Sequence, residues 1–101
     1  MWQFFADLKT LPQLKSFVSE GGVCISLDAL PGALNALEQG YASALVGYSW
    51  YEFGRIAVDV LIAAIKQGVK PADPVHTELF VVDATNIADM QRRYKESGGR
   101  I

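Results

Sequence analysis

The sequence predicts an α/β fold, in which a parallel sheet of about four strands alternates with helices. Short apolar runs recur along the chain, and each is followed by a segment whose apolar residues have helical spacing. Glycine or proline stands at most of the boundaries between these segments. The chain has 101 residues, half of them hydrophobic, which suits one core and a single α/β unit without a linker between domains.

The expected strands and helices alternate along the chain. Strands are expected at 2–5, 23–27, 43–47 and 78–82. Helices are expected between Thr10 and Gly21, from Pro31 to Gly40, over 50–67 and over 87–96. The two prolines of segment 69–75 predict a surface loop.

The longest helix is the one expected over 50–67. Ser49 is positioned to cap it, and Glu52 stands at the third helical position, as in a capping box. Asn86 is expected to cap the last helix. The apolar spacing within the long helix predicts a buried face formed by Phe53, Ile56, Ala57, Val60, Leu61 and Ala64.

Composition argues against several classes of function. Nine Lys and Arg against eleven Asp and Glu give a net charge of −2, without a basic patch for nucleic acid. No apolar stretch approaches the ~20 residues that span a bilayer, and the amino end lacks the basic leader of a secretory signal. The lone Cys24 excludes an internal disulfide and a cysteine metal cluster, and no glycine-rich phosphate loop is present. We therefore expect no nucleic acid, metal or cofactor.

Two side chains stand where predicted strands end and helices follow. In an open α/β sheet, ligands bind outside the carboxyl ends of parallel strands. Asp28 follows the strand at 23–27, where its carboxylate either binds the hydroxyls of a polyol or caps the next helix. Tyr48 follows the strand at 43–47, with Trp50 and Tyr51 close behind, and these rings suit either core packing or ligand contact. We rank Tyr48 above Trp50, because Trp50 equally suits packing as the first helical residue.

Two potentially reactive side chains are not expected to act in catalysis. His76 is the only histidine and lies in the proline-bounded loop, far along the chain from Asp28. Cys24 stands near the start of its strand, between Val23 and Ile25, where a buried inert thiol is expected. The chain is therefore not expected to be an enzyme.

A set of segments resembles a known family: SLD, ALPGALNALEQG, ALVG, YSWYEFGRIAVDVLIAAIKQG and TELFVVDATN. Together, from Val23 to Asn86, they resemble the carboxy-terminal third of ribose- and galactose-type sugar-binding proteins of bacterial ABC transporters, which have the type I periplasmic binding fold. The resemblance implies that Asp28 binds sugar hydroxyls and that Tyr48 is a second contact. Tyr48 departs from the amide usual there, and Trp50 replaces a usual proline.

The resemblance also implies a site, partners and a location. Asp28, Tyr48 and Trp50 would contact a sugar-like ligand, with Asp7 at the first strand exit as a further contact. The whole protein would be periplasmic and would deliver its ligand to a membrane permease.

The family has two lobes joined by crossing segments, and hinge bending closes these lobes around the ligand. Residues 1–48 would belong to one lobe, and 49–101 would hold a hinge crossing and parts of the other. Such a fragment is expected to expose apolar surface and to associate with itself or with a missing segment. Two alternatives stay open: the effector-binding part of a lactose-repressor-type regulator, and an independent small self-associating α/β protein.

Overall fold

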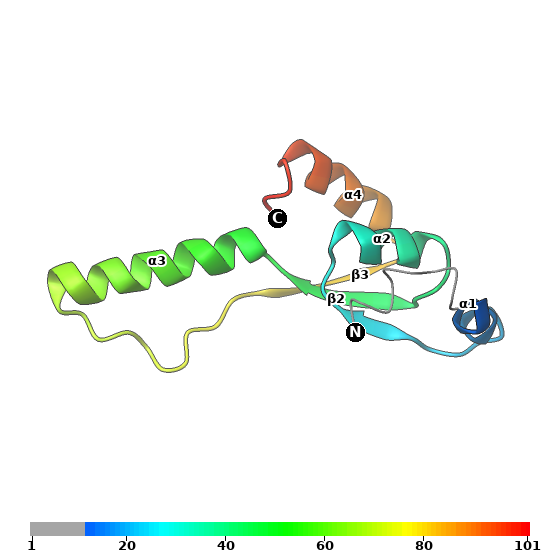
Figure 1. Ribbon diagram of the computed structural model, residues 1–101, viewed down its shortest axis with the longest axis horizontal. Coiled ribbons are helices and arrows are strands. Elements are labelled where there is room, and N and C mark those ends of the chain that lie inside the picture. The colour runs from blue at the N-terminus through cyan, green and yellow to red at the C-terminus, as the bar shows by residue number, and fades with distance from the viewer. Residues whose placement is uncertain (1–11) are drawn as a thin grey trace.

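The computed structural model describes residues 12–101, which form four helices and a three-stranded sheet (Figure 1). In chain order the elements are α1 (Pro12–Ser19), β1 (Ile25–Leu27), α2 (Pro31–Glu38), β2 (Ala44–Tyr48), α3 (Trp50–Gln67), β3 (Leu79–Asp83) and α4 (Ile87–Glu96). The expected α/β fold class is confirmed. The strand expected at 2–5 lies outside the described residues.

The sheet has the strand order β1-β2-β3 and is only partly parallel. β1 pairs with β2 in parallel, with Leu27 opposite Val46, whereas β2 and β3 are antiparallel, with Val46 opposite Val81. The parallel direction expected of β3 is therefore wrong. A parallel crossover requires its helix to pack back across the sheet, but α3 continues away from the end of β2. The chain then returns through segment 69–78 and enters β3 at the end of the sheet where β2 leaves it, with Leu79 opposite Tyr48 (Figure 1).

The core lies between the sheet and two helices, α2 and α4, which cover one face of it (Figure 1). Leu45 of β2 and Val82 of β3 are fully buried, and Met90 of α4 packs with them. The core side of α2 is formed by Ala33, Leu34, Ala36 and Leu37. Burying one large aliphatic side chain contributes roughly 1.5–3 kcal/mol, so this layer is the main source of stability among the described elements.

Gly47 allows β2 to lie close to its neighbours. A β-carbon at this position would stand 2.7 Å from the Phe80 ring and 2.8 Å from the β-carbon of Ala29. These distances are too short for any side chain, so the aromatic ring of β3 packs directly against the backbone of β2.

The long helix α3 begins and ends as the sequence predicts. The Ser49 hydroxyl accepts a hydrogen bond from the Glu52 amide at 3.1 Å, which confirms the expected cap. Gly68 ends the helix in the left-handed conformation, with φ 64°, and its amide donates to the Ala63 carbonyl.

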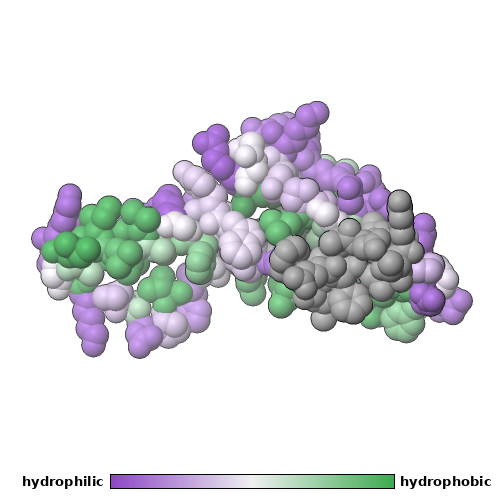
Figure 2. All heavy atoms as spheres, in the orientation of Figure 1, coloured by the Kyte–Doolittle hydropathy of each residue, from purple (hydrophilic) through white to green (hydrophobic). Residues whose placement is uncertain are grey.

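The expectation that α3 has a buried face is wrong, because the helix has no buried residue. It projects beyond the sheet instead of packing on it (Figure 1), and apolar side chains show on its surface (Figure 2). None of the six residues expected on that face is buried: Phe53, Ile56, Ala57, Val60, Leu61 and Ala64. The apolar pattern of the helix is amphipathic, as predicted, but no described element lies where it could cover it.

Asn86 precedes α4, as expected, but its side chain does not cap the helix. Its Oδ1 accepts from the Asp83 amide at 2.9 Å, and its Nδ2 donates to the Val81 carbonyl at 2.9 Å. Asn86 therefore stabilises the end of β3 and the turn that leads into α4.

No helix among residues 12–101 combines the length and the apolar character that crossing a membrane requires.

Candidate functional site

The parallel pairing of β1 and β2 brings their carboxyl ends together. Asp28 directly follows β1, and Tyr48 is the last residue of β2. The Asp28 amide donates to the Val46 carbonyl at 2.8 Å, which extends the ladder one residue beyond Leu27. The two residues that the sequence places at strand ends thus lie at one edge of the sheet.

The backbone at Asp28 is in the left-handed region, with φ 72°. Aspartate and asparagine tolerate this conformation better than other residues that carry a side chain. The helix-capping alternative does not hold, because the cap residue of α2 is Leu30 and no side chain caps that helix. Asp28 therefore ends β1 with a sharp turn and presents a carboxylate at the edge of the sheet.

Asp28 and Tyr48 also interact electrostatically. The pKa of the Tyr48 phenol lies above its usual 10.0, first because burial disfavours the phenolate. The Asp28 carboxylate raises this pKa further, through its negative charge and as a hydrogen-bond acceptor. The edge thus combines a protonated phenol, which donates and accepts, with an acceptor carboxylate.

Aromatic rings flank this pair. The Trp50 ring lies 4.9 Å from the Tyr48 ring, centroid to centroid, with an angle of 43° between the ring planes. The Phe53 ring lies 6.4 Å from the same Tyr48 ring, with an angle of 57° between the planes. Trp50 is nonetheless 49% exposed, so it packs on Tyr48 and still offers a ring face to solvent. Phe53 belongs to the same cluster, although the sequence predicts it only as part of a buried helix face.

The other candidate residues do not join this edge. Asp7 lies outside the described residues. Tyr51 is 49% exposed and lines a shallow depression on α3 with Arg55 and Asp59. Cys24 packs against the core but is only half-buried, less than the buried thiol expected. Within residues 12–101, no group of three side chains is arranged to hold a metal ion.

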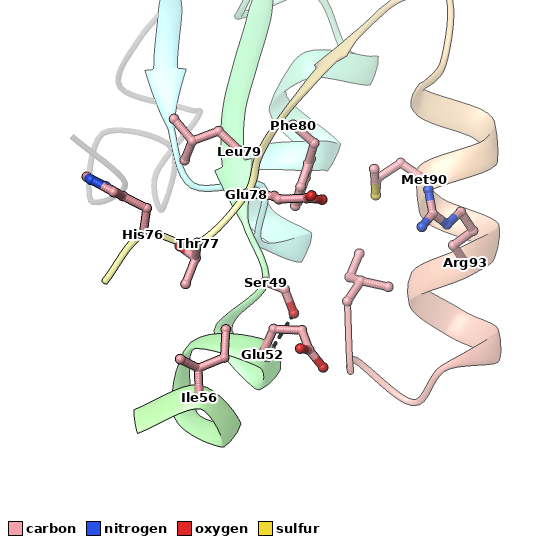
Figure 3. Close-up of a pocket in the computed structure, with 11 residues that line it drawn as sticks. Ser49, Glu52, Ile56, His76, Thr77, Glu78, Leu79, Phe80, Met90 and Arg93 are labelled. Carbon is pink, nitrogen blue, oxygen red and sulfur yellow. Dashed lines mark hydrogen bonds between the residues drawn. The ribbon is translucent and has the colours of Figure 1, made fainter. Parts of the chain in front are cut away.

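A more enclosed hollow than the depression on α3 lies between the start of α3, the start of β3 and α4 (Figure 3). It has a volume of about 550 Å³. Phe80 and Met90 point toward each other from opposite walls, whereas His76 points away (Figure 3). The charged side chains that line the hollow are Glu52, Glu78 and Arg93.

Sequence reasoning missed this hollow because its walls come from segments far apart in the chain. We place the ligand site at the Asp28 edge nonetheless. The hollow exposes the flank of the apolar core, while the edge joins a carboxylate, a phenol and an indole at the ends of parallel strands. That convergence is the stronger signature of binding.

The fold defines the class of structure to which the described residues belong. They form a fragment of a periplasmic-binding-protein-like fold. The comparison that shows this is with the crystal structure of a periplasmic ribose ABC transporter protein from Conexibacter woesei. The two are similar with a TM-score of 0.63 and 25% sequence identity, over 81% of this chain and 29% of that one. The chain thus spans less than a third of its structural neighbour.

Searches by sequence add no relative. No family model matches the chain, and no curated protein matches it. The evidence of similarity is therefore structural, and it concerns a protein described as a periplasmic ribose ABC transporter.

Proposed function

We propose that this chain is the carboxy-terminal part of a solute-binding protein that binds a sugar or polyol for uptake by an ABC transporter. The observation that carries this proposal is the placement of Asp28 and Tyr48 at the carboxyl ends of the parallel strands β1 and β2. Support also comes from the likeness to a structure described as a periplasmic ribose ABC transporter. By that likeness the whole protein acts in the periplasm and passes its ligand to a membrane permease, without catalysis.

The chemistry of the edge suits a polyol. A carboxylate accepts hydrogen bonds from two neighbouring hydroxyls, and such charge-assisted bonds contribute about 1.5–3 kcal/mol each. The Tyr48 phenol donates to a ring or hydroxyl oxygen, and the exposed face of Trp50 packs on the apolar C–H face of a sugar. Asp7, which precedes the described residues, is proposed as a further contact.

The division into lobes is also a proposal. Residues 1–48 would belong to one lobe, and 49–101 would form a hinge crossing and parts of the other. Its support is that α3 begins directly after β2 and projects beyond the layered part of the chain (Figure 1). The ligand edge then lies next to the hinge, where closure of two lobes would enclose the ligand.

Binding at the edge is tested by two-dimensional NMR of the 101-residue chain titrated with ribose, glucose and ribitol. The amide signals of Asp28, Gly47 and Tyr48 should shift with at least one of these compounds. Asp28→Asn keeps the size and tolerates the left-handed backbone, but it removes the charge. We expect it to weaken binding about tenfold or more, which corresponds to about 1.4 kcal/mol or more.

The matched control is Glu20→Gln, which removes a carboxylate from an exposed position after α1. It should bind as the unmodified chain does. Shifts confined to the hollow around Phe80 and Met90, or equal affinity in Asp28→Asn, would contradict the assignment of the site.

A further inference from the structure

The edge that we propose as the ligand site carries a negative charge. The Asp28 carboxylate acts on the Tyr48 phenol through its charge and as a hydrogen-bond acceptor. Of the charged groups in the part of the chain that the structure describes, Asp28 is the one that shifts the Tyr48 pKa. The ion pairs within residues 12–101 are made by Arg55 and Arg92, and none of them includes Asp28. A ligand at this edge therefore meets a carboxylate that no described cation neutralises.

The cation closest to Tyr48 in the sequence, Arg55, is held by two other carboxylates. Its Nη2 lies 2.7 Å from Oε2 of Glu52, and its Nη1 lies 2.7 Å from Oδ2 of Asp59. One guanidinium between two carboxylates leaves this cluster with a net charge of −1, so the cluster does not offset the charge of Asp28. The start of α3 thus adds to the negative character of the region.

Tyr48 connects this carboxylate to two further aromatic rings. The Trp50 and Phe53 centroids lie 4.9 and 6.4 Å from that of Tyr48, and the two residues are 49% and 53% exposed. The face of an aromatic ring attracts a cation that lies within about 6 Å of its centroid. Among the described residues, the cation placed in this way is Lys15, whose Nζ lies 5.6 Å from the Tyr41 centroid. The exposed rings beside Tyr48 are thus open to a cation that the ligand brings.

We propose, on the basis of the sugar site proposed above, that the ligand of this edge is an amino sugar, a polyol that carries a protonated amine. Its ammonium group pairs with the Asp28 carboxylate and lies over the exposed face of Trp50. Its neighbouring hydroxyl groups bond to the second oxygen of Asp28 and to the Tyr48 phenol. A neutral sugar makes the hydroxyl contacts alone, so the edge discriminates between the two by charge.

The test compares sugars that differ in one substituent. The 101-residue chain is titrated with glucosamine, glucose and N-acetylglucosamine at about pH 6, where an amine of this kind is protonated. Affinities are measured from the amide signals of Asp28 and Tyr48 in two-dimensional NMR spectra. We expect glucosamine to bind about tenfold more tightly than glucose. N-acetylglucosamine keeps the nitrogen without its charge and should bind as glucose does.

Three variants locate the source of this preference. The ratio of the two affinities, glucosamine to glucose, is compared within each variant, so that a general loss of affinity cancels. Asp28→Asn should bring the ratio close to one. Trp50→Leu should lower it about two- to fivefold, the effect of one exposed cation–ring contact. The matched control is Tyr51→Leu, which removes an equally exposed ring, also 49% exposed, from outside the Tyr48 cluster and should leave the ratio unchanged.

The outcomes separate this proposal from the sugar site on which it rests. Equal affinities for glucosamine and glucose would overturn the preference for charge and leave the sugar site standing. Binding of none of the three compounds would overturn both. A preference that Asp28→Asn retains would show that another group recognises the amine, and would overturn the proposal. Tetramethylammonium has the charge without hydroxyl groups, so binding as tight as that of glucosamine would indicate an organic cation and not an amino sugar.

Discussion

Two helices of this chain, α2 and α3, differ in how far their apolar residues are buried. In α2, four residues are buried against the sheet, whereas the longer α3 buries none. Both have amphipathic sequences, so the difference lies in what each helix finds beside it. The short connections around α2 hold it over β1 and β2, while α3 leaves the end of β2 and meets no described layer (Figure 1). Apolar periodicity identifies a helix and its apolar face, but burial depends on the partner.

The largest effect expected from this comparison is on a core leucine. Leu45 is fully buried, and Leu45→Ala should lower the free energy of unfolding by about 2–5 kcal/mol through lost contacts and a cavity. The matched change on α3, Leu61→Ala, should alter the free energy of unfolding by about 0.5 kcal/mol or less, because Leu61 is 59% exposed.

Urea denaturation followed by circular dichroism measures both leucine variants, at a concentration where sedimentation shows a monomer. Equal losses of stability would contradict the contrast between the two regions.

Two glycines sharpen the same contrast. Gly47→Ala places a β-carbon 2.7 Å from the Phe80 ring and should destabilise the chain by about 1–3 kcal/mol through overpacking. Gly54 of α3 has nothing within 4 Å of such a β-carbon. Gly54→Ala should therefore stabilise the helix by about 0.5–1 kcal/mol.

The opposite signs of the two glycine substitutions should appear in thermal melts under identical conditions. Destabilisation by Gly54→Ala would show that α3 is closely packed against something on that side.

A smaller, pH-dependent effect is expected at the end of β3. The pKa of Asp83 lies below its usual 3.8, because the Thr85 hydroxyl and amide donate to its Oδ1 at 2.6 and 2.8 Å. This contribution to stability is present above pH 3.8 and is lost as the pH falls through the lowered folded-state pKa. Asp83→Asn should therefore be less stable than the unmodified chain near neutral pH and should approach it in acid.

Urea titrations of both chains across this pH range measure the Asp83 effect. A difference that stays constant down to the most acid point would rule out the carboxylate as its source.

The sequence was sufficient for local features and for the candidate edge. Ser49 caps α3 as predicted, because a cap depends on residues three apart. Asp28 and Tyr48 were predicted at neighbouring strand ends, and the parallel register of β1 and β2 places them there. The direction of β3 was missed, because it depends on where α3 goes and not on the residues of β3 itself. The role of Asn86 was missed because the sequence cannot distinguish a helix cap from a contact with the preceding strand.

The titration of Tyr48 tests most directly the central claim, which is that Asp28 and Tyr48 form one site. The ring carbon signals of Tyr48 can be followed by NMR across alkaline pH in the unmodified chain, in Asp28→Asn and in the control Glu20→Gln. The pKa of Tyr48 should lie above 10.0 in the unmodified chain and in the control. In Asp28→Asn it should fall toward that value, because the negative charge is gone while the burial stays. A Tyr48 pKa that Asp28→Asn leaves unchanged would show that the two side chains do not interact, and would contradict the site.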